Sequence, residues 1–236
     1  MRLTWGARWA WPVACTTGES EAMCLANRGR LLRDTARLRE AEKDWNDALS
    51  LQKQLAADSP KQPDLQNEVA RTCVNLAVLY EQQGNWAAAK GQLLEARPHH
   101  LAALKANPLH PTYRGFYRPY LVALTGLHAG LLEQQDAVRT AGTCRDLGWD
   151  APADAYEAAC ALSQCVAIVS KHDKLDGKQR KESARFYSDA AMKMLREAVS
   201  KGYQDVPNLK KDTDLDPLRQ REDFQKLVAE LEGKGR

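Results

Sequence analysis

The feature that most constrains this chain is a pattern of small and large side chains that occurs in residues 27–48 and again in residues 75–96. In both segments small residues hold matching places between bulky ones. The matched pairs are Asn27/Asn75, Gly29/Ala77, Leu32/Tyr80, Ala36/Gly84, Leu38/Trp86, Ala41/Ala89, Trp45/Leu93 and Ala48/Ala96. We call the constant offset of these pairs, from Asn27 to Asn75, the repeat interval. A fixed interval of this kind indicates that one structural unit is built several times.

A third, weaker copy is aligned with the second at a slightly longer offset, the one from Leu76 to Leu127. Its matching residues are Leu127, Leu131, Ala137, Thr140, Cys144 and Leu147.

The spacing within each copy predicts a helix, a tight turn and a second, antiparallel helix. We expect Ala77 to pack on Ala89, and Gly29 on Ala41, because small residues let two helices approach closely. Gly84 and Ala36 are expected at the turns, where a left-handed residue ends the first helix. Polar capping groups are available beside them, at Asn85 and at Asp34–Thr35. One hairpin cannot bury its own apolar face, so neighbouring units must stack.

These residues resemble the tetratricopeptide repeat, whose pattern is W-x2-L-G-x2-Y…G…A-x3-F-x2-A-x4-P. The residues that fit it in order are Leu76, Ala77, Tyr80, Gly84, Ala89, Leu93 and Ala96, while Cys73 replaces the Trp and Leu101 the Pro. The resemblance implies an all-α, TPR-like α-solenoid of antiparallel helical hairpins with a C-terminal capping helix. It also implies a role in contacts with other proteins.

A narrower resemblance covers the long second helices and the end of the chain. The segment "DALSLQKQLAADSP" at 47–60, "AYEAACALSQC" at 155–165 and residues 195–232 are similar to the extended repeats that follow the kinase domain of many bacterial serine/threonine protein kinases. This similarity implies a regulatory or protein-binding array, and it carries no catalytic residue onto this chain.

The organisation that we expect follows from the repeats and the helix stops between them. Ala14-Cys15 could end a lipoprotein signal, but Arg8 interrupts the apolar stretch and Pro12 replaces the Leu that such a signal prefers, so we expect an unprocessed leader. A charged loop is expected over 171–181 and a final helix over 217–232. The segments are a disordered leader (1–21), repeat one (22–62), repeat two (63–107), repeat three (112–148), a degenerate hairpin (151–201) and a C-terminal cap (202–236).

Composition argues against nucleic-acid binding and against membrane insertion. The net charge of +3 falls short of a concentrated basic stripe, and aromatic residues are only 7% of the chain. No apolar run approaches the roughly 18 residues that a membrane span needs. None of the six cysteines forms C-x-x-C, which favours a reducing, cytoplasmic compartment without disulfides. The cysteines are Cys15, Cys24, Cys73, Cys144, Cys160 and Cys165.

Catalytic and metal-binding patterns are weak. The motifs of kinase catalysis are missing, although "VAIVSK" at 166–171 faintly resembles the strand-lysine motif. Asp212, Asp214, Asp216 and Asp223 occupy EF-hand positions 1, 3, 5 and 12, but Pro217 stands where the loop requires Gly. We therefore expect these carboxylates to cap helical turns, with Asp216-Pro217 starting the last helix.

Three further groups receive structural interpretations. A zinc site at Cys160, Cys165 and His172 would lack a fourth ligand, so we expect no metal and no cofactor. His99-His100 is interpreted as polar surface. The basic segment 171–185 is interleaved with acids and is interpreted as a solvated face.

The remaining candidate is the concave groove that the first helices of such an array line. An Asn there can hold a peptide backbone and an Arg can hold a carboxylate, which resembles half of the carboxylate clamp of chaperone-binding TPR domains. The matching positions in repeat three, Val122 and Gly126, lack the other half. The candidate residues are Asn27, Arg30, Asp34, Arg71, Asn75, Val78 and Gln82.

The sequence therefore predicts a non-catalytic protein-interaction scaffold that binds a peptide or a protein in this groove. Two alternatives remain open. The chain could be a detached or truncated regulatory tail of a bacterial serine/threonine kinase. It could also be an enzyme whose site is assembled from residues that are distant in sequence.

Overall fold

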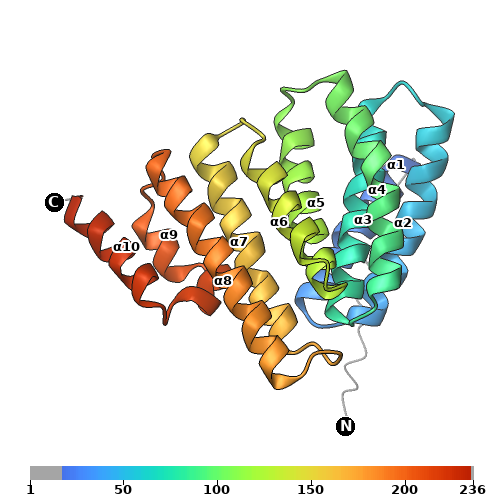
Figure 1. Cartoon of the computed structure of the whole chain (residues 1–236). Coiled ribbons are helices and arrows are strands. Elements are labelled where there is room, and N and C mark those ends of the chain that lie inside the picture. Colours follow the sequence, from blue (N-terminus) through green and yellow to red (C-terminus); the bar gives the residue numbers. More distant parts are fainter. Residues whose placement is uncertain (1–17, 235–236) are drawn as a thin grey trace, which may run out of the picture.

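The computed structural model describes residues 18–234, and every regular element within that range is a helix (Figure 1). Residues 1–17 of the expected leader lie outside the described residues, and residues 18–21 already belong to the first helix. The elements are α1 (Gly18–Asp34), α2 (Leu38–Asp58), α3 (Pro63–Gln82), α4 (Trp86–Ala106), α5 (Pro111–Gly130), α6 (Gln134–Arg145), α7 (Ala151–Ser170), α8 (Gly177–Ser200), α9 (Val206–Lys211), the 3-10 helix η1 (Thr213–Leu218) and α10 (Glu222–Lys234).

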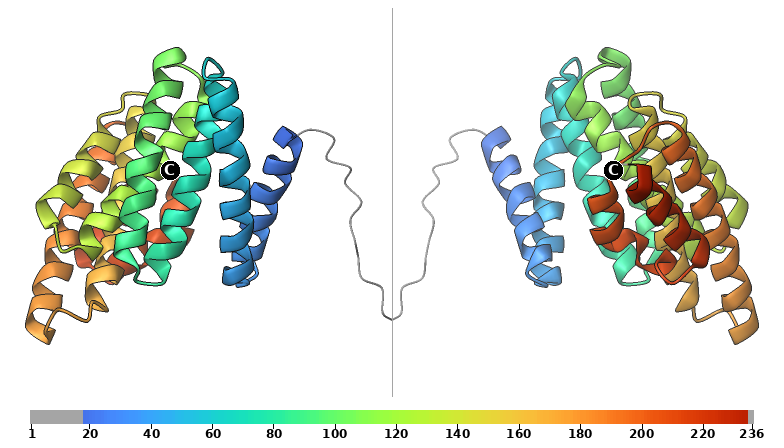
Figure 2. Two further views of the ribbon diagram at one scale, coloured as in Figure 1. Left: turned by 90° about the vertical axis from the view of Figure 1, so that its right-hand side faces the viewer. Right: turned by 90° about the vertical axis from the view of Figure 1, so that its left-hand side faces the viewer.

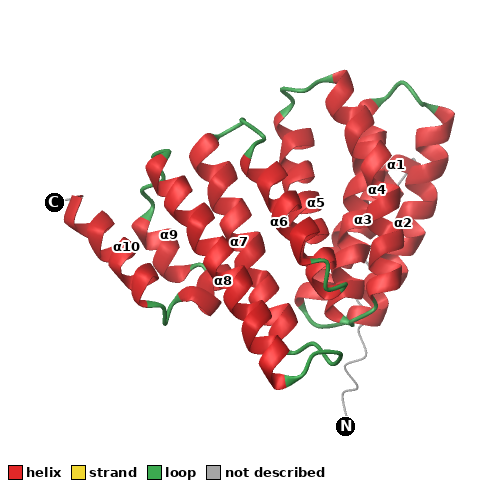
Figure 3. Cartoon of the chain, viewed as in Figure 1, coloured by secondary structure: helices red, strands yellow, loops and turns green. Residues whose placement is uncertain are grey.

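The helices form a TPR-like solenoid, which confirms the predicted fold class. Consecutive helices pair as antiparallel hairpins, α1 with α2, α3 with α4, α5 with α6 and α7 with α8. Figures 1 and 2 show the hairpins stacked in chain order, with α1 at one end and α10 at the other. Figure 3 shows that the links between the helices are short.

The turn inside the hairpin has the same geometry in the first three hairpins. Ala36, Gly84 and Leu132 adopt positive φ angles of 59°, 71° and 63°. In each turn the next N–H donates 2.8 Å back to the carbonyl five residues earlier. This is the bond that closes a helix after a left-handed residue, and it satisfies a carbonyl that the helix end leaves open.

The same repeat interval holds throughout these three hairpins, so the longer offset used to align the third copy is wrong. The second helices begin at Leu38, Trp86 and Gln134, which are evenly spaced by the repeat interval. The sequence misled because Leu132 holds the left-handed place that Gly84 marks in repeat two. A leucine in that conformation gives no sequence signal, since glycine is the residue that normally adopts it.

The packing inside the first hairpin also differs from the expectation. A Cβ added to Gly29 would meet Trp45 Nε1 at 2.6 Å, so the nearest neighbour of Gly29 is Trp45 rather than Ala41. The Trp45 indole donates 3.0 Å to the Ala26 carbonyl, and this bond holds the ring in place. Ala41 and Ala89 are nevertheless fully buried, as a close helix contact requires.

The stacking of the hairpins brings the first helices together. α5 packs against both α3 and α7, whereas the second helices α2, α4 and α6 pack mainly on first helices, with a Lys53–Glu95 ion pair between α2 and α4. When the first helices of neighbouring hairpins lie closer together than the second helices do, the stack curves toward the first helices. The partly exposed surface of α3, α5 and α7 is therefore the inner side of the curve, and we call it the first-helix face.

Capping side chains define the ends of α4 and α8. Asn85 accepts a hydrogen bond from the Ala88 N–H at 3.2 Å, as predicted. The charged loop expected over 171–181 is shorter, because α8 already begins at Gly177. The cause is a capping box, in which Asp176 accepts from the Gln179 N–H and Gln179 accepts from the Asp176 N–H.

The C-terminal cap is built from η1 and α10, with a start that differs from the prediction. Asp216 and Pro217 lie inside η1, and the last helix begins five residues later, at Glu222. The cause is Asp212, whose carboxylate accepts from the Asp214 N–H and starts η1 instead.

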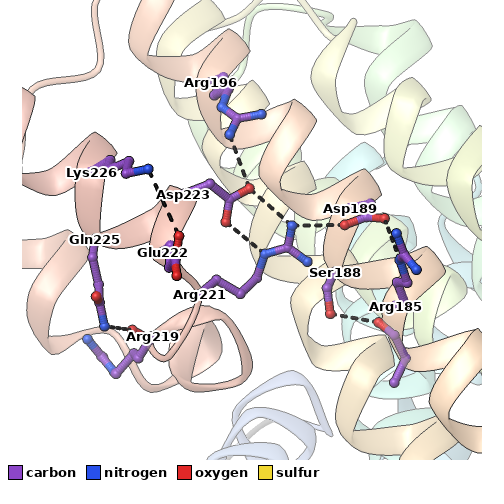
Figure 4. A network of polar contacts seen from close by, with 11 residues as sticks. Arg185, Ser188, Asp189, Arg196, Arg219, Arg221, Glu222, Asp223, Gln225 and Lys226 are labelled. Atoms are coloured by element: carbon purple, nitrogen blue, oxygen red, sulfur yellow. Dashed lines mark hydrogen bonds and ion pairs between the residues drawn. The ribbon is translucent and has the colours of Figure 1, made fainter.

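An arginine joins this cap to α8 (Figure 4). The Arg221 guanidinium lies 2.8 Å from the Asp189 carboxylate of α8 and 2.9 Å from that of Asp223. Arg196 of α8 also pairs with Asp223, at 3.1 Å. Asp212 and Asp223, two residues of the EF-hand-like spacing, thus form contacts within the chain.

Candidate binding face on the first helices

The predicted groove residues of α3 share one stripe of the first-helix face. Arg71, Asn75, Val78 and Gln82 are spaced four, three and four residues apart, which places them on one side of a helix. The first three are partly buried and Gln82 is exposed. The candidates on α1, which are Asn27, Arg30 and Asp34, are all exposed, and Asp34 pairs with Arg33 at 2.9 Å.

Arg71 is anchored to its surroundings. Its guanidinium forms an ion pair with Glu68 and lies 5.3 Å from the centroid of the Phe116 ring of α5. Its Nε is buried and has no hydrogen-bond partner in the described structure. The guanidinium therefore has an unpaired donor that is buried at the α3–α5 seam, and a ligand could reach it only if a neighbouring side chain moved.

The half-clamp does not continue along the array. One repeat interval beyond Arg71 and Asn75, the third hairpin holds Pro119 and Ala123, so these are the matching positions and not Val122 and Gly126. Neither side chain offers a polar hydrogen. In the first hairpin Asn27 matches Asn75, but Met23 stands where Arg71 would be. The geometry thus supports an asparagine pair and one arginine rather than a full carboxylate clamp.

Glu81 was absent from the sequence-based candidates, yet it has the most perturbed carboxyl of this face. It lies on the flank of α3 toward α5, where a Cβ on Gly126 would be 3.4 Å from its Oε2. Its Oε1 is buried and has no hydrogen-bond partner. Burial raises the pKa of Glu81 to about 8, and no neighbouring charge offsets that shift.

The sequence places Glu81 on one flank of α3 but does not show that this flank is buried. Asn67, Val74 and Glu81 are seven residues apart, so they follow one flank of α3, and Asn67 is only 2% exposed with a partnerless Oδ1. Polar residues at both ends of a buried flank are unusual, because a buried polar group without a partner costs free energy. The spacing alone could not reveal this, since it does not say which flank faces a neighbouring helix.

The same face continues across α7 to the cap. Glu157, Gln164 and Ile168 lie along one side of α7 and are partly buried. Ile168 Cδ1 would be 3.6 Å from a Cβ on Gly126, which places it beside Glu81. Gln164 hydrogen-bonds to Asp214 of η1. Burial raises the pKa of both Glu157 and Asp214.

Other buried carboxylates of the chain are paired. Asp44 accepts two hydrogen bonds from Arg28, one of them at 2.7 Å. Asp154 is fully buried and accepts from Arg118 at 2.9 Å and from the backbone N–H of Trp149. These pairs stabilise the structure and leave the carboxylates of Asp44 and Asp154 unavailable to a ligand.

His100 corrects the interpretation of His99-His100 as polar surface. The His100 ring is fully buried between Tyr117 and Tyr120, with centroids 5.7 and 5.3 Å away. Burial lowers its pKa to about 4. Position 100 lies on the side of α4 that packs toward α5, and an aromatic cluster there can take a neutral imidazole. His99 is half-buried, and its Nδ1 lies 2.6 Å from Gln66 Oε1.

The structure does not assemble the zinc set of the sequence analysis. The Cys165 thiol donates to the carbonyls of Ala161 and Thr125, and His172 Nε2 donates 3.0 Å to the Gly130 carbonyl. Cys160 instead lies near Asp212 and Asp214, with ligand atoms within 4.8 Å of one another. Burial raises the pKa of the Cys160 thiol, which disfavours the thiolate that a metal needs.

Surface charges elsewhere pair locally. In the basic segment 171–185, Lys178 lies 3.9 Å from Glu182, and Arg185 lies 3.7 Å from Asp189. On the turn before α6, His128 lies 2.6 Å from Glu133. Such exposed pairs contribute little free energy and define no site.

Comparison with protein families agrees with this architecture. Residues 22–61 and 69–98 match the family described as tetratricopeptide repeat. The first segment spans most of α1 and all of α2, and the second spans α3 from Val69 and α4 up to Pro98. These two segments are therefore similar to tetratricopeptide repeats, in agreement with the stacked hairpins of the structure. No match was found among curated proteins or among solved structures. Within residues 18–234, no helix is long and apolar enough to cross a membrane.

Proposed function

We propose that this protein is a non-catalytic interaction scaffold that binds a peptide or protein segment along the first-helix face. The observation that carries the proposal is the stripe of Arg71, Asn75, Val78 and Gln82 on α3, in repeats that match a family used for protein contacts. Several side chains of this stripe can each make a modest hydrogen bond to an extended backbone, and together they give useful affinity.

The test is capture of partner proteins by the purified chain and by the double variant Arg71→Ala/Asn75→Ala. The matched control removes the same residue types from the second helices, as Asn46→Ala/Arg97→Ala. Circular dichroism checks that both variants keep their helices. We expect the first variant to bind the partners that the wild type and the control capture at least tenfold more weakly. This corresponds to about 1.4 kcal/mol of binding free energy. Equal capture by all three proteins would place binding elsewhere.

A second candidate is a regulatory region of a bacterial serine/threonine kinase. What supports it is the similarity of residues 47–60, 155–165 and 195–232 to the repeats that follow such kinase domains. A kinase reading frame directly upstream of this sequence in its genome would favour this candidate, and an unrelated upstream frame would argue against it.

We also propose a reducing, cytoplasmic location. Cys73, Cys144, Cys160 and Cys165 are free thiols, and all four are buried. Thiol labelling under denaturing conditions, on protein purified without reductant, tests this. Full labelling is expected, and protected thiols would contradict the proposal.

A further inference from the structure

Among the described residues, the carboxyl of Glu81 differs from the buried acids Asp44 and Asp154. Asp44 and Asp154 each lie against an arginine, whereas burial shifts the pKa of Glu81 with no neighbouring charge to offset it. A glutamine would fill the same volume without the cost of burying an ionisable group. An acid kept at such a place is explained if its partner comes from another molecule.

The surroundings of Glu81 suit the end of a long cationic side chain. Gly126 of α5 has no side chain to cover Oε2, and a methyl group there would already be in contact at 3.4 Å. Val78 and Ile168 are partly buried hydrophobic residues at the α3 and α7 sides of this place. Lysine and arginine carry methylene stems that pack on such groups while the charge reaches a carboxylate.

The charge of the neighbouring surface points the same way. Glu157 and Asp214 continue the first-helix face beyond Ile168, and neither forms an ion pair within residues 18–234. On the α3 stripe the cation is Arg71, which Glu68 already holds. The part of this face from Glu81 to η1 therefore carries ionisable carboxyl groups whose charged forms a nearby cation would favour, which complements a basic segment.

We propose that the first-helix face between α3 and η1 binds a basic peptide segment, with the Glu81 carboxylate paired to a lysine or arginine side chain of that segment. The inference rests on the proposed function and adds the chemical class of the partner. The pairing supplies the cation that the buried carboxylate lacks, and a nearby cation lowers the pKa of Glu81 and favours its charged form.

The experiment measures fluorescence anisotropy with an end-blocked, labelled peptide of alternating lysine and alanine, and with a control peptide that has glutamine in place of lysine. The proteins are the wild type, Glu81→Gln and Glu230→Gln, which makes the same charge change on the exposed side of α10. We expect the wild type and Glu230→Gln to bind the basic peptide, Glu81→Gln to bind it at least fivefold more weakly, and the neutral peptide to bind poorly to all three.

A second variant keeps the carboxyl and narrows the access to it. Gly126→Ala adds a methyl group 3.4 Å from the Oε2 atom of Glu81, so it should also weaken binding of the basic peptide. Equal affinity of Glu81→Gln and Glu230→Gln for the basic peptide would overturn the inference, as would the absence of basic-peptide binding by the wild type. The proposed function is judged separately, by whether Arg71→Ala/Asn75→Ala loses captured partners.

Discussion

The contact between Gly29 and Trp45 gives the sharpest test of how the repeats are packed. In Gly29→Ala the new methyl group would lie 2.6 Å from Trp45 Nε1, well inside a van der Waals contact. The indole cannot yield freely, because its N–H bond to the Ala26 carbonyl holds it at 3.0 Å. The helix must therefore move away from its partner or the ring must lose that hydrogen bond.

The expected change in the free energy of unfolding combines one stabilising effect and two destabilising effects. Replacing Gly by Ala inside a helix stabilises by about 0.5–1 kcal/mol. Overpacking a close contact destabilises by about 1–3 kcal/mol, and weakening the buried Trp45 hydrogen bond adds about 1 kcal/mol. Gly29→Ala should thus lower the free energy of unfolding by about 1–3 kcal/mol. Gly91→Ala is the control, since a methyl group there meets nothing within 4 Å, and it should stabilise by about 0.5–1 kcal/mol.

The repeat itself supplies the compensating change. The positions of Gly29 and Trp45 are held in the next hairpin by Ala77 and Leu93, one repeat interval later, and all four are buried. A larger residue on the first helix thus accompanies a smaller one on the second. The double variant Gly29→Ala/Trp45→Leu places the residues of the second hairpin, Ala and Leu, at these positions of the first hairpin. Its loss of unfolding free energy should be about 1–2 kcal/mol smaller than the sum of the losses of the two single variants.

Urea unfolding followed by circular dichroism measures the free energy of unfolding of the wild type, the three single variants and the double variant. Trp45→Leu alone should cost about 2–4 kcal/mol, because it leaves a cavity and removes the indole hydrogen bond. A Gly29→Ala variant as stable as the wild type would refute the packing argument. Strict additivity of the two changes would refute the claim that their sizes are coupled.

Three further outcomes are expected. Ala89→Leu, at a fully buried position of α4, should lower the free energy of unfolding by about 1–3 kcal/mol in the same urea assay, and a neutral effect would mean that the α3–α4 contact has room. Because the pKa of Glu81 is raised from 4.5 to about 8, the folded state binds its proton more tightly, and the stability that this gives is complete below about pH 4.5 and lost as the pH rises through about 8. Glu81→Gln should therefore be relatively more stable than the wild type at pH 8.5 than at pH 5, by on the order of 2 kcal/mol, and identical pH profiles would contradict the burial of this carboxyl. Arg221→Met should lower the melting temperature by a few degrees in low salt and less in high salt, because it removes one ionic link between the cap and α8 and leaves the Arg196–Asp223 pair, and a salt-independent effect would point to lost packing instead.

The sequence was sufficient to predict the fold because the repeated positions are the ones that packing dictates. Ala41, Ala89 and Ala137 are all fully buried, and they are evenly spaced by the repeat interval. The third turn escaped prediction because a left-handed leucine, Leu132, carries no sequence signal of that conformation. His100 escaped because a histidine on a helix looks polar until the aromatic neighbours from the next helix are known.

The first-helix face was predicted less completely, for a related reason. Stripe spacing on α3 is visible in the sequence, so Arg71 and Asn75 could be named in advance. The exposure of a flank to α5 and the absence of a cation near a carboxyl depend on tertiary contacts, and Glu81 could only be recognised from them.

A contrast between core and surface positions explains where the specificity of this array must lie. Core positions 41, 89 and 137 keep the same residue type from one repeat to the next, because each must fit between two helices. On the first-helix face the repetition is broken, and the positions that match Glu81 hold Arg33 and Ala129. The repeated core residues allow the hairpins to stack, and the residues that differ between repeats give each hairpin its own polar groups. A ligand that contacts several hairpins at once therefore binds residues that occur only once. Glu81 has the most strongly shifted carboxyl pKa of this face, so we expect binding there to depend most on charge.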